Sequence, residues 1–248
     1  MKTNLALFLI CCITLLACEK SSDSNSAAGN TSTSNGSLTR FITYSNNLYL
    51  VDNSNLKGYS ITNPGTPVFV KSVSVGFNIE TIFVLQDKLL IGSNNAIFIY
   101  SVANPDNPTL MSRFNYFIPG RDPVVAQDSV AYSTTRNFGT NAGGNLNIVN
   151  IKNLANPLPV TTIPLENPFG LAINGNALYV SEGANGLKVF NKTNAYSIVL
   201  NKSINNLGET FYDIIVDGNL MICYIKSGIM LFDVSSKLNP VFISKLKN

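Results

Sequence analysis

Three carboxylates are the residues of this chain best suited to acid–base chemistry. Glu80, Asp122 and Asp213 each lie near the start of an apolar, strand-like run. Two carboxyl groups about 5.5 Å apart or somewhat more can hydrolyse a glycosidic bond, one as acid and the other as base or nucleophile. The three occupy different positions of a repeated pattern described below, which argues against a shared role. Catalysis by them is therefore the less favoured of two interpretations. The simpler one is a set of polar residues at a channel mouth, with Arg121 balancing Asp122.

A second group of residues is suited to binding. The third repeat carries an insertion over residues 133–145, and an exposed Phe beside an Arg in such a loop can contact a sugar, a peptide or a polymer. Repeat proteins also tolerate insertions of no functional consequence, so neutral length variation is the other interpretation. The candidate ligand-binding residues are Arg121, Arg136, Phe138, Glu209 and Tyr212.

Composition excludes several other kinds of chemistry. The chain has no His and no Trp, which excludes a His-based triad, an imidazole metal site and a tryptophan sugar platform. Calcium needs about six to eight oxygens from clustered acidic residues, whereas the acidic loop residues are scattered along the chain. We therefore expect no metal and no cofactor. The acidic loop residues are Asp52, Asp106, Glu182 and Asp233.

Charge excludes nucleic acid as a partner. Charged residues make up 12% of the 248 residues and the formal net charge is +3. A nucleic-acid binder carries a basic stripe with interleaved aromatic residues, and the lysines here are scattered. The length is sufficient for one large domain with a substantial apolar core.

The N-terminus has the pattern of an export signal. Lys2 precedes an apolar run over residues 5–16, which as a helix is about 18 Å long and too short for a hydrocarbon core of roughly 30 Å. The run ends in the Leu-Leu-Ala-Cys of residues 15–18, which resembles the lipobox of bacterial lipoproteins. That resemblance implies that residues 1–17 are a signal peptide and that Cys18 is lipidated. An ordinary secretory signal with a chance cysteine is the other interpretation.

The residues after Cys18 predict a tether. Residues 18–37 are mostly Ser, Asn, Gly, Thr and Ala, which cannot bury enough surface to offset their ordering entropy. The stretch 19–23 loosely resembles the acidic export signal of Bacteroidetes surface lipoproteins. The expected location is the cell envelope, lipid-anchored in the outer membrane and facing the periplasm or the surface. Only Cys223 lies beyond the tether, so no intrachain disulfide forms there, and we expect Cys223 to be buried as an apolar residue.

The rest of the chain repeats. A polar turn between two apolar runs recurs with spacings of 41, 41, 48 and 42 residues, and an Asn- and Pro-rich turn follows about twenty residues after most of these turns. Each unit contains four short runs of β-forming residues bounded by turn residues. This predicts an all-β fold over residues 38–248, a β-propeller of five blades with four antiparallel strands each; an open β-solenoid is the alternative. The turn markers are Asn46, Asp87, Asp128, Asn176 and Gly218.

Several segments resemble a known family. Residues 178–183 with 186–190, and residues 228–235 with 239–241, are similar to the LVIVD repeat of bacterial and archaeal surface proteins. The resemblance covers essentially all of residues 38–248. It implies propeller units of about 42 residues and a location outside the cytoplasm, and it implies no established activity.

The sequence alone leaves two ways in which the ring of blades could close. Either residues 39–43 form the first strand of the first blade, or residues 38–44 complete the last blade as a strap. A fragment of a larger propeller assembly is a further alternative.

These observations predict a non-catalytic, lipid-anchored protein. Its propeller serves as a binding or scaffolding platform for a glycan, a peptide or an envelope protein. The alternative is a hydrolase of carbohydrates that uses the three carboxylates.

Overall fold

The computed structural model describes residues 38–115, 123–136, 143–205 and 207–247. They belong to one compact unit, Ser32–Asn248. The described residues form twenty strands and no helix, in five antiparallel sheets of four strands each. The signal peptide, Cys18 and the tether of the sequence prediction lie outside the described residues.

Each sheet is made of four consecutive strands. The first blade is β1 (Phe41–Tyr44), β2 (Asn47–Val51), β3 (Asn55–Ser60) and β4 (Val68–Ser74); the second is β5 (Ile79–Leu85), β6 (Lys88–Ser93), β7 (Ala96–Ser101) and β8 (Thr109–Asn115); the third is β9 (Val124–Gln127), β10 (Val130–Arg136), β11 (Gly144–Asn150) and β12 (Leu158–Leu165); the fourth is β13 (Leu171–Asn174), β14 (Ala177–Ser181), β15 (Leu187–Asn191) and β16 (Val199–Ile204); the fifth is β17 (Phe211–Asp217), β18 (Leu220–Ile225), β19 (Gly228–Asp233) and β20 (Val241–Lys247).

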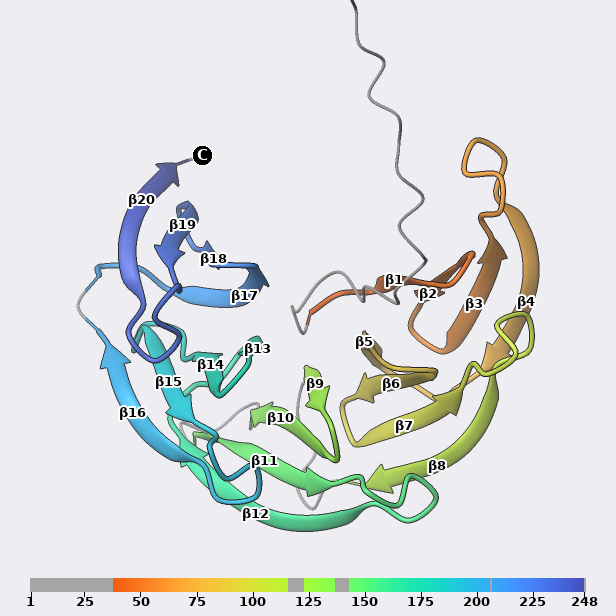
Figure 1. The fold of residues 1–248 in the computed structure, drawn as a ribbon, viewed down its shortest axis with the longest axis horizontal. Coiled ribbons are helices and arrows are strands. Elements are labelled where there is room, and N and C mark those ends of the chain that lie inside the picture. Colours follow the sequence, from red (N-terminus) through yellow and green to blue (C-terminus); the bar gives the residue numbers. More distant parts are fainter. Residues whose placement is uncertain (1–37, 116–122, 137–142, 206, 248) are drawn as a thin grey trace, which may run out of the picture. The chain divides into compact units, whose positions relative to one another are not determined.

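The five sheets form a β-propeller, as predicted (Figure 1). The first strand of each blade is the inner one, and β1, β5, β9, β13 and β17 contact one another in that order. Because β1 pairs with β2, the first blade is contiguous in sequence, and residues 38–44 do not complete the last blade as a strap. Within the described residues, no extensive strand contact joins the fifth blade to the first.

The turn between the first two strands sets the register of each blade. Its first residue has a positive φ in every blade, the conformation that two-residue hairpins with the twist of β-strands require. These residues are Ser45, Gln86, Asp128, Gly175 and Gly218. Their spacings are 41, 42, 47 and 43, so the marker alignment made from the sequence is one residue out in the third and fifth units.

The abundance of Asn and Ser follows from a second repeated turn. In all five blades, the side chain of the last residue of the third strand accepts a hydrogen bond from the backbone N–H two residues later, which closes a turn and fixes the approach of the fourth strand. The acceptors are Ser60, Ser101, Asn150, Asn191 and Asp233.

Buried tyrosines join neighbouring blades. Tyr49, Tyr132 and Tyr179 occupy the same position of the second strand, and each hydroxyl donates a hydrogen bond to a backbone carbonyl in the turn before the fourth strand of the next blade. The O···O distances are 2.7, 2.8 and 2.7 Å. In the second blade Leu90 takes this position, and the equivalent carbonyl of the third blade, that of Leu154, accepts a hydrogen bond from the Ser112 hydroxyl of β8 instead.

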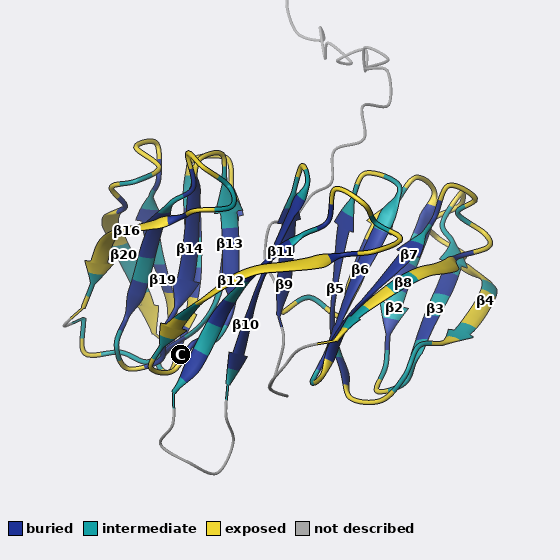
Figure 2. Ribbon diagram, turned by 90° about the horizontal axis from the view of Figure 1, so that it is seen from below, coloured by how far each residue is buried: buried dark blue, intermediate teal, exposed yellow. Residues whose placement is uncertain are grey.

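The core lies between the sheets. Each of its three clusters contains residues of adjacent blades, while the fourth strands form the exposed rim (Figure 2). Cys223 is completely buried among apolar residues of the fourth and fifth blades, as predicted.

Burial predicts how stability depends on pH. It raises the pKa of Tyr49, Tyr132 and Tyr179, and also that of the Cys223 thiol. The unfolded chain therefore loses these protons at a lower pH than the native protein. Since the native state then holds more protons, the free energy of unfolding falls as pH rises above about 9, by about 1.4 kcal/mol per pH unit for each group that titrates only when unfolded.

Urea unfolding between pH 8 and 11 measures this slope. The Tyr179→Phe variant loses one hydrogen bond, about 1 kcal/mol of stability at neutral pH, and its slope above pH 10 is shallower than that of the wild type. Equal slopes in the two proteins would contradict the explanation.

Candidate functional site

The candidate site lies at the end of the ring where the inner strands begin. Four described residues lie six residues before the turn of their blade: Thr39 and Phe169 just before β1 and β13, and Glu80 and Tyr212 within β5 and β17. Glu80 and Tyr212 are the extra residues of β-bulges, because Ile79 and Thr81 pair with successive residues of β6, and β17 pairs with β18 in the same way. A bulge re-aims the side chain of the inserted residue.

Arg136 and three aromatic rings form a row across three blades. The Arg136 guanidinium carbon lies 3.6 Å from the ring centroid of Phe169. The Phe169 and Tyr212 centroids are 5.3 Å apart in an edge-to-face arrangement, and those of Tyr212 and Tyr224 are 5.6 Å apart. We call these four residues the cation–aromatic row. Such a row offers both flat apolar faces and a positive charge to a ligand.

Backbone contacts hold the centre of the row in place. The Phe169 N–H donates to the Ser181 carbonyl, and the Phe169 carbonyl accepts a hydrogen bond from the Thr134 hydroxyl of the third blade. The next residue, Gly170, donates its N–H to the Tyr212 carbonyl at 2.9 Å, which ties the fourth blade to the fifth. The ring of Phe169 is therefore positioned by residues of all three blades that the row crosses.

The structure brings two of the predicted ligand-binding residues together. Arg136 and Tyr212 meet through Phe169, which the sequence prediction missed together with Tyr224. Phe169 lies six residues before the turn residue Gly175, and Tyr212 lies six residues before the turn residue Gly218, so their equivalence emerges only when the left-handed turn residues are aligned. Arg121, Asp122 and Phe138 lie outside the described residues.

Glu209, another predicted ligand-binding residue, is already held by two partners. It accepts hydrogen bonds from Lys245 Nζ and from the Ser227 hydroxyl, the latter at 2.7 Å. The hydrogen bond from Lys245 is the main cause that lowers the pKa of Glu209. Lys245 belongs to β20 and Ser227 to the turn between β18 and β19. Glu209 therefore links the segment before β17 to the other strands of the fifth blade.

The described carboxylates of the catalytic alternative come from separate blades. Glu80 precedes the turn of the second blade by six residues, and Asp213 precedes that of the fifth blade by five. Asp213 Oδ1 is buried, and it lies where a side chain on Gly170 would be, 2.0 Å from an ideal Cβ there. Asp213 therefore fills the seam between the fourth and fifth blades.

A buried ion pair lies on the fourth blade. Glu182 Oε2 is 3.2 Å from Lys188 Nζ, and the Glu182 side chain is 2% exposed. Its other oxygen accepts the N–H of Glu166 at 2.8 Å, and Glu166 in turn accepts a hydrogen bond from Asn185. These bonds order the loop of residues 182–186 beside the row.

The acidic loop residues considered for calcium each accept a hydrogen bond or form an ion pair within the protein. Asp52 accepts the N–H groups of Ser54 and Asn55 and pairs with Lys57 at 2.8 Å, and the hydrogen bond from Lys57 is the main cause that lowers its pKa. Within the described ranges, no three His, Cys, Asp or Glu side chains are grouped so that they could hold a metal ion.

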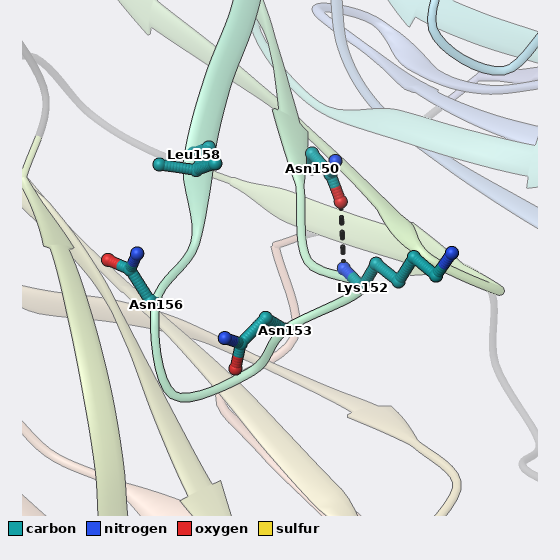
Figure 3. A pocket seen from close by; sticks show the side chains of 5 residues that line it. All are labelled: Asn150, Lys152, Asn153, Asn156 and Leu158. Atoms are coloured by element: carbon teal, nitrogen blue, oxygen red, sulfur yellow. Dashed lines mark hydrogen bonds between the residues drawn. The ribbon is translucent and has the colours of Figure 1, made fainter.

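A surface hollow of about 380 Å³ lies on the third blade (Figure 3). The Asn150 side chain there accepts the N–H of Lys152 at 2.9 Å, which is the same turn that every blade contains. The hollow is therefore a consequence of the repeated turn. Its lining residues are Asn150, Lys152, Asn153, Asn156 and Leu158.

The chain is similar in fold to solved structures of low sequence identity. The periplasmic gluconolactonase PpgL of Pseudomonas aeruginosa matches 82% of the chain with a TM-score of 0.65 and 11% identity, over 69% of its own length. BamB of Moraxella catarrhalis matches 75% with a TM-score of 0.57 and 10% identity, and AztD of Citrobacter koseri matches 80% with a TM-score of 0.57 and 13% identity. The match covers 53% of BamB and 59% of AztD, so this chain spans little more than half their length.

No family model matches the chain, and no curated protein does. The resemblance to the LVIVD repeat therefore stays a prediction, while the five-bladed propeller is confirmed. In the part of the chain that the structure describes, no helix has the length and apolar character needed to cross a membrane.

The seam beneath the row predicts the effect of a small substitution. In Gly170→Ala the new methyl group meets Asp213 Oδ1 at 2.0 Å and Asp213 Cα at 2.9 Å, so the fourth and fifth blades must separate. We expect the free energy of unfolding to fall by about 1–3 kcal/mol in urea unfolding. Gly58→Ala is the matched control, because its methyl group comes no closer than 3.6 Å to any neighbour, and a comparable loss in both variants would refute the clash.

Proposed function

We propose that this chain is a non-catalytic binding protein of the cell envelope whose ligand lies on the cation–aromatic row. The observation that carries the proposal is the stacking of Arg136, Phe169 and Tyr212 across the third, fourth and fifth blades. Aromatic rings held by the backbone contact a ligand at little entropic cost. A row over three blades favours an extended ligand, such as a glycan chain or a peptide segment of an envelope protein.

The proposal that the protein is not an enzyme rests on the carboxylates. Asp213 lies in the seam against Gly170, and Glu80 comes from the second blade, with the third and fourth blades between them along the ring. A glycosidase needs two carboxyl groups on either side of one bond. The fold likeness to a protein named a gluconolactonase favours the hydrolase as the second candidate.

Location in the envelope is supported mainly by the sequence. The apolar run ending in Cys18 predicts lipidation, and PpgL, which is similar in fold, is named as periplasmic. Several acyl chains give durable membrane anchoring, whereas one gives only reversible binding. The inferred arrangement is a propeller tethered to the outer membrane through Cys18.

The binding proposal is tested with labelled oligosaccharides and peptides of the envelope, titrated against the full chain. For a probe that binds, Tyr212→Ala and Arg136→Gln weaken the affinity about tenfold or more, since each removes one element of the row. Tyr59→Ala is the control, because it removes an aromatic pair of the first blade, Tyr59 with Phe69. Unchanged affinity in both row variants would sink the proposal.

The same probes separate binding from hydrolysis. Turnover of a probe that disappears in the combined variant Glu80→Gln, Asp122→Asn and Asp213→Asn, with binding retained, would replace the platform by the hydrolase. Binding without turnover supports the platform.

Anchoring is tested by labelling the protein in cells with radioactive fatty acid. Cys18→Ser removes the thiol that carries the lipid, so we expect the protein to lose the label. Cys223→Ser, whose thiol is buried, keeps the label. Labelling of Cys18→Ser as strong as that of the wild type would overturn the lipid anchor.

A further inference from the structure

The fifth blade presents an apolar face that is not covered by another described blade. Ile215, Tyr224 and Ile229 on this face are 39%, 56% and 37% exposed, and Ile222 and Leu231 lie on the same face, half-buried. Figure 1 shows the fifth and first blades at opposite sides of the opening in the ring. We call these five residues the end face.

The end face has the composition of an interface between blades. In the first blade the equivalent positions hold Ile42, Tyr49, Val51 and Leu56, which are 4%, 0%, 5% and 1% exposed because the second blade covers them. Sheets that pack face to face bury such alternating residues in a layer about 10 Å thick. The same positions on the fifth blade are therefore suited to packing against a sheet.

The free face of the first blade is of a different character. It carries Phe41, Leu48 and Leu50, but also Thr43 and Lys57, and Lys57 pairs with Asp52 at 2.8 Å. An ion pair about 40% exposed is readily solvated. Covering the end face would therefore stabilise the protein more than covering the free face of the first blade.

Charge at the borders of the end face indicates what covers it. The residues at its centre are all uncharged. Asp217 and Asp233 lie at the border beside the turn of residues 218–219, whereas Lys226 lies in the turn at the opposite border. A second end face turned about a two-fold axis, with its strands antiparallel to the first, would bring each acidic border to a basic one.

We propose that two copies of this chain associate through their end faces about a two-fold axis. Such a contact uses the same surface on both copies and closes on itself, so it leaves no complementary face to propagate. The uncharged centre meets itself without like-charge repulsion, and the borders pair opposite charges. Apart from Tyr224, the end face shares no residue with the cation–aromatic row.

Sedimentation equilibrium of the full chain in density-matched detergent tests the proposal. We expect twice the mass of one chain at micromolar concentration. Ile222→Asp places a carboxylate at the centre of the contact and raises the dissociation constant of the dimer about a hundredfold. Ile229→Asp, on the neighbouring strand, has the same effect, and a circular dichroism spectrum like that of the wild type shows that each variant is folded.

Two further variants test the geometry. Leu48→Asp puts the same charge on the free face of the first blade and leaves the dimer intact. Lys226→Glu weakens the dimer about tenfold, and adding Asp217→Lys restores it, because the two borders then exchange signs.

Three results would overturn the proposal. A wild-type chain that stays monomeric across the concentration series leaves the end face to the chain's own first blade or to another protein. Loss of the dimer in Leu48→Asp as well as in Ile222→Asp indicates head-to-tail association. Failure of Asp217→Lys to restore the Lys226→Glu variant excludes the antiparallel arrangement.

Discussion

Burial of apolar sheet faces between successive blades is the interaction on which the rest of the structure depends. A four-stranded sheet with two apolar faces is not stable in water alone, so each blade is stabilised by the blades that it packs against. In the second blade Leu89, Leu90 and Ile91 are all 0% exposed, because one face packs on the first blade and the other on the third. Such strands are continuous apolar runs, since both faces are covered, and the fifth blade keeps this pattern on its outer face.

Turn chemistry made the blades predictable. Each blade repeats a hairpin with a left-handed residue and an Asn, Ser or Asp turn before the fourth strand, and these signals recur in the sequence at a nearly constant period. The exact alignment of equivalent residues between the blades was harder to predict from the sequence. Asp128 and Gly218 are themselves the left-handed residues, whereas in the other three blades the aligned marker residue followed that position. A shift of one residue moves a side chain to the opposite face of a strand, and here it hides that Phe169 and Tyr212 occupy equivalent positions.

Contacts between blades could not be predicted from the period of the strands. The hydroxyl of Tyr179 meets a carbonyl of Lys237, 58 residues further along the chain. Arg136 was a candidate because it stands in an insertion, but its stacking on Phe169 depends on the backbone of Phe169, on the missing side chain of Gly170 and on the bulge at Tyr212. Those are properties of packed sheets, and a single sequence shows only which faces are apolar.

The position of the row couples ligand binding to the cohesion of the ring. Arg136, Phe169 and Tyr212 come from three different blades, so a ligand that lies along the row contacts both seams between them. A ligand that binds only while these blades are packed stabilises the packed state by mass action, in proportion to the logarithm of its concentration over the dissociation constant. The seam between the fourth and fifth blades thus contributes both to ligand binding and to the cohesion of the ring. At this seam Asp213 lies against Gly170, and Gly170 donates a hydrogen bond to Tyr212. Among the described blades, the fifth packs extensively only on the fourth, so its other face and the end of the row at Tyr224 both depend on the seam between these two blades.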